Sequence, residues 1–103
     1  MPLVDVVLDA AADTRIPSTG INSLALLAQY ADANGIVGPD EEGRSLADPR
    51  NVAAHLGAGA STVTRAFGML EQLGYIRWTR SWKSGPHNRP GSVQIIQSRS
   101  VAA

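Results

Sequence analysis

Three polar side chains between residues 60 and 73 have the chemistry to recognise a polar partner. Ser61, Thr64 and Arg65 are spaced so that a helix would present them on one face, followed there by Gly68 and Gln72. An arginine guanidinium can donate two parallel hydrogen bonds, and each hydroxyl can both donate and accept one. Such a group can bind phosphate or the polar edge of a base. The alternative is an ordinary solvated helix face.

A second group of polar side chains lies in the segment KSGPHNRPG, residues 83–91. Its glycines and prolines predict a turn-rich loop. The loop carries Lys83, His87 and Arg89, and Arg77 and Arg80 precede it. Cations on a projecting loop can contact phosphate. The alternative is again a solvated loop tip.

Groups that usually perform catalysis or hold a metal are sparse. The chain has no cysteine, and its two histidines, His55 and His87, have no second ligand at a metal-binding spacing. His55 is expected to be a partly buried helix residue. Asp40, Glu41 and Glu42 lack the spacing of a calcium loop, so a solvated acidic loop is expected there. We therefore predict neither enzymatic activity nor a metal or cofactor.

The elements that position these residues follow from apolar periodicity and capping signals. A buried stripe predicts a helix over about 60–73 that ends at Gly74; it consists of Val63, Ala66, Phe67, Leu70 and Leu73. Asp48 followed by Pro49 predicts the start of a short helix over 49–56. Similar periodicity predicts a helix over about 20–34, capped by Ser18 or Thr19.

Strands are expected at the C-terminal end of the chain. Residues 75–82 alternate and are aromatic, and residues 92–97 form the return strand across the loop. Trp78 and Trp82 are expected to pack the sheet onto the helices, although they could instead form a stacking platform for single-stranded bases. Residues 1–17 have strand-favouring and helix-favouring stretches, and the tail 98–103 carries no strong signal. The predicted fold is mainly α with a small β-hairpin, an α+β class.

At residues 52–76, VAAHLGAGASTVTRAFGMLEQLGYI, the sequence resembles the helix-turn-helix of bacterial winged-helix regulators. The shared pattern is carried by Val52-Ala53, Leu56-Gly57, Thr62-Val63, Arg65, Leu70, Leu73-Gly74 and Ile76. With the helix over 20–34 included, residues 18–97 resemble the winged helix-turn-helix domains common in phage, plasmid and replication-associated proteins of bacteria. Two positions depart from the pattern, since Gly59 replaces a serine or threonine and Gly68 a cation.

The resemblance implies a DNA-reading role for the helix over about 60–73, whose N-terminal part would enter the major groove. Arg65 could then donate two bonds to guanine, while Ser61 and Thr64 contact phosphates or base edges. Ala60 is small enough to let a phosphate approach the helix N-terminus, although a tight turn alone would also need small residues. Thr62 is expected nearer the core boundary, where it would support the turn.

The neighbouring elements would contact the DNA backbone. Arg50 and Asn51 lie in the first turn of the helix that crosses the backbone in this motif, so phosphate contacts are expected from them. The hairpin would be the wing, with Arg89 in the minor groove and Lys83 on a phosphate. His87 belongs to the loop of this wing, and Arg77 and Arg80 on the preceding strand would flank the same path.

The charge distribution separates two halves of the chain. Residues 1–43 carry one arginine against seven acidic residues, and residues 44–103 carry eight cations against two acidic residues, although the net charge of the whole chain is zero. A basic surface that attracts phosphate is therefore expected in the second part. The alternative function is a winged helix that serves as a protein-interaction module.

The remaining expectations concern organisation and location. The length of 103 residues fits one domain over 18–97, with residues 1–17 as a possible dimerisation element and 98–103 as a flexible tail. No apolar run is long enough to span a membrane, and no signal peptide is recognised, so a cytoplasmic protein is expected. The expected partners are double-stranded DNA and a second copy of the chain. A transcription regulator and a replication, partition or excision accessory factor are equally compatible with the sequence.

Overall fold

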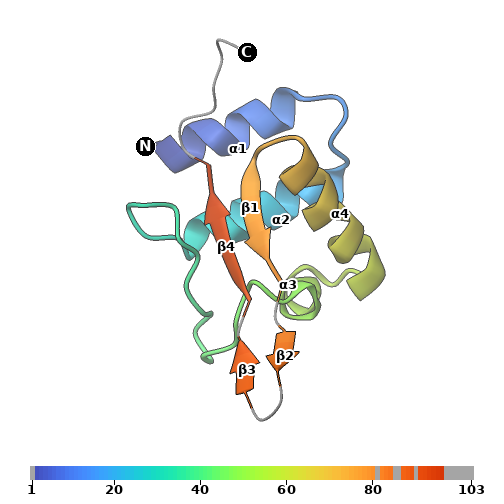
Figure 1. The fold of residues 1–103 in the computed structure, drawn as a ribbon. Helices are drawn as coiled ribbons and strands as arrows, with labels where there is room; N and C mark the ends of the chain where they lie inside the picture. Colours follow the sequence, from blue (N-terminus) through green and yellow to red (C-terminus); the bar gives the residue numbers. More distant parts are fainter. Residues whose placement is uncertain (1, 81, 85–86, 90, 97–103) are drawn as a thin grey trace.

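The computed structural model describes residues 2–80, 82–84, 87–89 and 91–96, with no side-chain detail for 82–84 and 87–89. Within these residues four helices are followed by four short strands (Figure 1). The helices are α1 (Pro2–Ala12), α2 (Ser18–Gln29), α3 (Pro49–Leu56) and α4 (Ala60–Gln72), and the strands are β1 (Ile76–Thr79), β2 (Trp82–Ser84), β3 (His87–Arg89) and β4 (Ser92–Ile95). The predicted class, mainly α with a small β-hairpin, is confirmed. No helix among the described residues has the length and apolar character needed to cross a bilayer.

The bounds of α3 and α4 are set by capping and helix-ending residues next to them in the sequence. The Asp48 side chain accepts a hydrogen bond from the Arg50 backbone N–H at 2.9 Å, and Pro49 occupies the first turn of α3. Gly57 ends α3 in the left-handed region at φ 64°, and Gly74 follows α4 at φ 86°. These are the starts and stops that the sequence predicts, so the two helices lie where they are expected.

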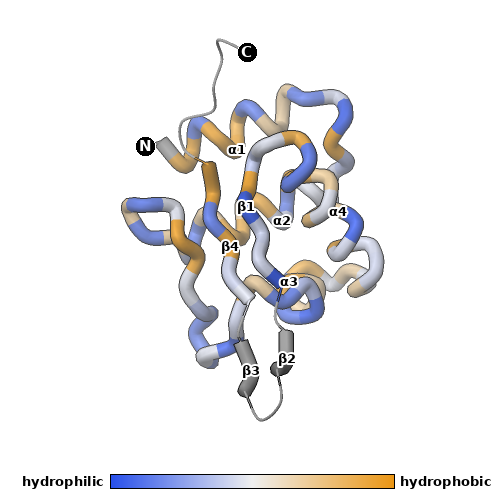
Figure 2. The backbone as a smooth tube through the Cα atoms, in the orientation of Figure 1, coloured by the Kyte–Doolittle hydropathy of each residue, from blue (hydrophilic) through white to orange (hydrophobic). Residues whose placement is uncertain are grey.

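All four helices and the strands β1 and β4 contribute to one core. Val63, Phe67 and Leu70 are fully buried on one face of α4, as predicted. Phe67 meets the edge of Trp78 with ring centroids 5.1 Å apart, and the Trp78 indole N–H donates to the Ala47 carbonyl at 3.1 Å. The predicted core role of Trp78 is therefore confirmed, whereas the Trp82 side chain lies outside the described atoms. The hydrophobic stretches of the backbone gather where α1, α2 and the nearby ends of β1 and β4 lie together (Figure 2).

Strand pairing in the hairpin extends further into the expected loop than the sequence predicts. β1 pairs with β4, and β2 pairs with β3, both antiparallel. The two pairs keep one register, because Thr79 faces Ser92 and, three residues further along each strand, Trp82 faces Arg89. The expected loop over 83–91 thus contains two short strands, and the expected strand over 75–82 is interrupted after Thr79.

α2 differs from its predicted bounds at both ends. Pro17 is its N-cap residue and no side chain caps the helix, so neither Ser18 nor Thr19 has the predicted capping role. The helix stops at Gln29 instead of continuing to residue 34. Residues after it turn back and run beside β4, where the Val37 N–H donates to the Val93 carbonyl at 3.0 Å.

The two turns between α2 and α3 share one hydrogen-bonding scheme. Each begins with an aspartate and has a glycine three residues later at positive φ, Asp32 with Gly35 (80°) and Asp40 with Gly43 (81°). In each turn the aspartate Oδ1 accepts from the backbone N–H groups two and four residues further on, at 2.8 to 3.0 Å. This Asp-x-x-Gly turn satisfies the backbone locally and explains why α2 ends early.

Residues 2–16 pack onto the rest of the molecule. Residues 2–12 form a helix, which resolves the helix-or-strand ambiguity of this segment, and Val6 and Ala10 belong to the common core. Just beyond α1, Asp13 accepts a hydrogen bond from the Tyr75 hydroxyl at 3.0 Å, which ties this segment to the start of the hairpin. The predicted flexible tail, 98–103, lies outside the described residues.

Candidate nucleic-acid interface

The exposed face of α4 brings together the central residues of the predicted site. Ser61, Thr62, Thr64 and Arg65 are all exposed, whereas Val63 between them is fully buried. Thr62 was expected nearer the core boundary; the helix instead turns it to solvent. The Thr64 hydroxyl donates to the Ala60 carbonyl at 2.9 Å, which leaves its oxygen lone pairs able to accept.

Arg65 has no ion pair or hydrogen-bond partner among the residues that the structure describes. Its side chain borders a shallow pocket of about 260 Å³ together with Thr62 and Met69 of α4 and with Pro17 and Thr19 at the start of α2. A guanidinium without an internal partner keeps all its donors for an external acceptor. Arg65 is therefore exposed, with its donors available to an acceptor outside the chain.

A second hollow, of about 330 Å³, lies between α4, the start of α3 and the hairpin. Arg50, Thr64 and Arg80 meet around it, with Trp78 and Pro49 as its apolar surface. Three predicted site residues from three different elements thus converge on one surface. The arrangement offers two cations to an anion lying between α4 and the hairpin, although the Asp48 carboxylate lines the same hollow and the Thr64 hydroxyl already donates to Ala60.

The two arginines at this hollow have internal partners. Arg50 donates to both Asp48 oxygens, with Nη2 at 2.8 Å from Oδ2, and its side chain is 80% exposed. These hydrogen bonds, first from the guanidinium and then from the backbone N–H, hold the pKa of Asp48 below its usual value. The Arg80 guanidinium carbon lies 3.9 Å from the centre of a Trp78 ring, and its Nη1 lies 3.8 Å from a Glu71 oxygen. Stacking on Trp78 fixes where the charge of Arg80 is presented.

Asn51 makes a contact that sequence reasoning missed. Its side-chain amide donates to the Ser45 carbonyl at 2.7 Å, which ties the start of α3 to the preceding loop. The predicted phosphate contact from Asn51 would have to use its remaining amide hydrogen. The sequence does not reveal this hydrogen bond, because its acceptor is a backbone carbonyl six residues away and every residue has such a group.

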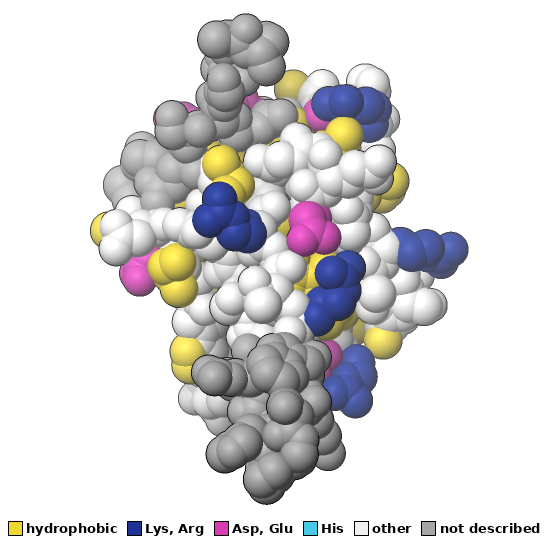
Figure 3. Space-filling view, viewed as in Figure 1, with side chains coloured by type: hydrophobic (Ala, Val, Ile, Leu, Met, Phe, Trp, Pro, Cys, Tyr) yellow, Lys and Arg dark blue, Asp and Glu magenta, His cyan; other side chains and the backbone are white. Residues whose placement is uncertain are grey.

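Lys83, His87 and Arg89 occupy the outer strands of the hairpin, where Lys83 faces Asn88, Ser84 faces His87 and Trp82 faces Arg89. Their side-chain positions lie outside the described atoms. These strands project beyond α3 at the end of the molecule opposite to α1 (Figure 1). Figure 3 shows Lys and Arg side chains separated by acidic and neutral residues over the described part of this face.

The acidic loop differs from its expected solvated form at Asp40. Its carboxylate is 1% exposed and accepts from Arg44 Nε at 2.8 Å, while His55 Nε2 lies 3.1 Å from the same oxygen. Burial raises the pKa of Asp40, but hydrogen bonds from the Arg44 backbone, the His55 ring and the Arg44 side chain together hold it well below its usual range. The expectation fails because the second carboxylate oxygen of Asp40 pairs with Arg44 and His55, whereas Asp32, in the same kind of turn, is exposed. Glu41 and Glu42 are exposed, as predicted.

The cluster around Asp40 has a positioning role for α3. His55 lies in α3, and its side chain is 24% exposed although the residue as a whole is exposed, so the expected partial burial holds for the imidazole ring. Its ring also lies 6.2 Å from that of Tyr30, whose hydroxyl donates to Glu41 at 3.0 Å. The contact therefore joins the end of α2, the acidic loop and α3. The Asp-x-x-Gly spacing was the signal in the sequence that could have revealed it.

No cluster of three or more potential metal ligands occurs among the described residues. Comparisons with protein-family models, with curated proteins and with solved structures give no match. The class that the fold itself defines is a helix-turn-helix unit followed by an antiparallel hairpin. Function is therefore argued from the residues of this surface.

Proposed function

We propose that the protein binds double-stranded DNA sequence-specifically, with α4 in the major groove and the hairpin near the minor groove. The observation that carries the proposal is the exposed face of α4, where Arg65 has no partner among the described residues and Ser61 and Thr64 stand beside it. Two bonds from Arg65 to a guanine would contribute about 1–3 kcal/mol of base discrimination.

The hollow beside α4 supports the docking mode. If α4 lies in the major groove, a neighbouring phosphate would come close to Arg50 and Arg80, which line this hollow together with Asp48. Arg50 would share its donors between Asp48 and the phosphate, so its contribution would be smaller than that of an unpaired arginine. In this proposal α4 reads the bases, while Arg50 of α3 and Arg80, directly after β1, hold the protein on the DNA backbone.

The proposed role is binding without chemistry on the DNA, in the cytoplasm, as a transcription regulator or as a replication, partition or excision accessory factor. A homodimer stays a prediction: two copies would place their α4 helices about one helical turn apart on a palindromic or directly repeated site. Sedimentation of the free chain and of its DNA complex would give the stoichiometry.

A salt titration with duplex DNA tests the proposal against the alternative of a protein-interaction module. The logarithm of the binding constant should fall steeply and linearly with the logarithm of the salt concentration, because each phosphate contact releases counterions from the DNA. If no duplex from a random-sequence pool binds even at low salt, the proposal fails.

Two variants test the division of labour within the site. On a duplex selected from the pool, Arg65→Ala should lose most of the preference over unrelated duplexes, whereas Lys83→Ala should weaken all duplexes alike. Both variants alter exposed or hairpin positions rather than the core, and circular dichroism would check that each retains its helices. Equal losses of preference in the two variants would contradict the assignment of base reading to α4.

A further inference from the structure

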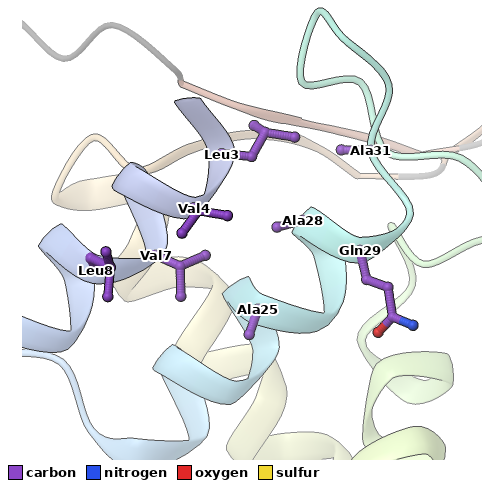
Figure 4. A pocket seen from close by; sticks show the side chains of 8 residues that line it. All are labelled: Leu3, Val4, Val7, Leu8, Ala25, Ala28, Gln29 and Ala31. Atoms are coloured by element: carbon purple, nitrogen blue, oxygen red, sulfur yellow. The ribbon is translucent and has the colours of Figure 1, made fainter. Parts of the chain in front are cut away.

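α1 and α2 leave a groove of about 400 Å³ between them, lined almost wholly by apolar side chains (Figure 4). α1 contributes Leu3, Val4, Val7 and Leu8 to it. The inner part of the groove is continuous with the core, because Leu3 and Val7 are partly buried against it, next to the fully packed Val6. The outer part, formed by Val4 and Leu8, is an apolar surface that the core does not cover.

Two of the groove residues are unusually exposed for their type. Val4 is 53% and Leu8 is 61% exposed, and they stand one helical turn apart on α1. Across the groove, α2 and the residues that follow it contribute three small apolar side chains, Ala25, Ala28 and Ala31, and one polar side chain, Gln29. Large apolar side chains on one wall and small ones on the other leave room for a partner helix to lie between them, with its own apolar side chains as anchors.

The charges around this groove have one sign. Proceeding around α1 from Val4 and Leu8, away from the core, the next positions are Asp5 and Asp9, both exposed. On the other side of the groove, the exposed Asp32 follows directly after Ala31. Residues 1–14 include no lysine or arginine.

The cation closest in sequence to α1 is already engaged. Arg15 donates to Asp13 at 2.6 Å, so its charge is compensated at the far end of α1. The apolar groove therefore has an acidic border with no described basic residue of its own to neutralise it.

The acidic border distinguishes between two occupants of the groove, a second copy of the chain and a basic helix of another protein. A second copy docking through the same face would pair Val4 with Leu8 of its partner around a two-fold axis, and would then bring Asp5 and Asp9 of both copies together. Like charges at such a distance oppose association. A helix with basic residues beside its apolar face would instead complement both the groove and its border.

We propose that the groove between α1 and α2 docks an amphipathic helix of a partner protein, one that carries lysine or arginine beside its apolar anchors. The groove lies on α1, at the end of the molecule opposite to β2 and β3 (Figure 1). No residue of the DNA-facing surface lines it. A partner could therefore occupy it while α4 reads DNA, and this inference does not depend on the proposed function.

Two synthetic helical peptides with the same apolar face test the proposal. Both carry leucine at positions i, i+3, i+4 and i+7; one has lysine and the other glutamate at the flanking positions. Fluorescence anisotropy with the 103-residue chain should show at least about tenfold tighter binding of the lysine peptide at low salt, from two or three exposed charge pairs. The difference should narrow as salt rises.

Variants identify the site on the chain. Leu8→Asn should weaken binding of the lysine peptide about tenfold or more, since it removes the most exposed anchor contact. The double variant Asp5→Asn and Asp9→Asn should bring the two peptides to similar affinities. Ile36→Asn is the matched control, because Ile36 is 43% exposed but lies outside the groove, and it should change neither affinity.

Three results would overturn the proposal. If the two peptides bind equally well, or if neither binds, a basic helix is not the occupant of the groove. An equal loss in Leu8→Asn and Ile36→Asn would show that the groove is not the site. Concentration-dependent dimerisation in sedimentation, abolished by Leu8→Asn, would identify a second copy as the occupant. DNA binding is measured separately, so these failures leave the DNA proposal untouched.

Discussion

Replacing Trp78 by phenylalanine tests how the hairpin is fixed to the helix-turn-helix. The indole N–H of Trp78 donates to the Ala47 carbonyl, and Ala47 is buried just before the cap of α3. Phenylalanine has no donor, so Trp78→Phe would leave this carbonyl without its partner. It would also shorten the ring that meets Phe67 edge-on.

The expected cost can be assembled from these two losses. A buried carbonyl left unpaired costs about 1–3 kcal/mol, and the atoms lost from a packed core add about 1 kcal/mol. The free energy of unfolding should therefore fall by about 2–4 kcal/mol, which lowers the melting temperature by roughly 8–20 °C in a domain of this size.

Urea and thermal denaturation followed by circular dichroism would measure this change. Thr79→Ala is the matched control, because Thr79 is the next residue of β1 and is exposed; it should stay within about 0.5 kcal/mol of the parent. If Trp78→Phe loses no more stability than Thr79→Ala, the hydrogen bond to Ala47 does not anchor the hairpin.

Three further predictions concern charge and backbone conformation. The pKa values of Asp13, bonded chiefly by the Arg15 side chain, and of Asp40 lie below their usual range, so the stability they provide is present above about pH 4 and is lost as pH falls further. Melting temperatures from pH 6 to pH 2 should show this, and a flatter profile is expected for Asp40→Asn. Gly74→Ala should destabilise by about 1 kcal/mol or more because of its φ of 86°, whereas Gly68→Ala, in open space within α4, should stabilise by about 0.5–1 kcal/mol; urea titrations would compare them. Arg80→Ala should weaken all duplexes and reduce the salt slope by about 1, and an unchanged slope would exclude a phosphate contact.

The parts of the fold that follow from the sequence are those encoded by neighbours along the chain. α3 and α4 have a cap, a proline, two stop glycines and a clear apolar stripe, so their bounds were predictable to within a residue or two. The core role of Trp78 followed from strand alternation next to an apolar helix. The exposed face of α4 followed from the same periodicity.

Other features depend on contacts that no short window reveals. The early end of α2 is set by a turn at Asp32 that competes with further helix, and the inward orientation of Asp40 depends on His55, fifteen residues away. The ion pair between Arg50 and Asp48 and the hydrogen bond from Asn51 to Ser45 redirect side chains that pattern reasoning assigns to phosphate. Composition identifies such groups as polar, but only the fold shows which of them already have partners.

The repeated Asp-x-x-Gly turn has a consequence for the order of folding. Residues 30–48 contain no helix, yet each turn completes its hydrogen bonds within five residues. Short closures lose little chain entropy, so the link between α2 and α3 can form early as two compact turns. The pairing of β1 with β4 joins residues as far apart in sequence as Ile76 and Ile95, so it closes a longer loop than either turn and loses more chain entropy.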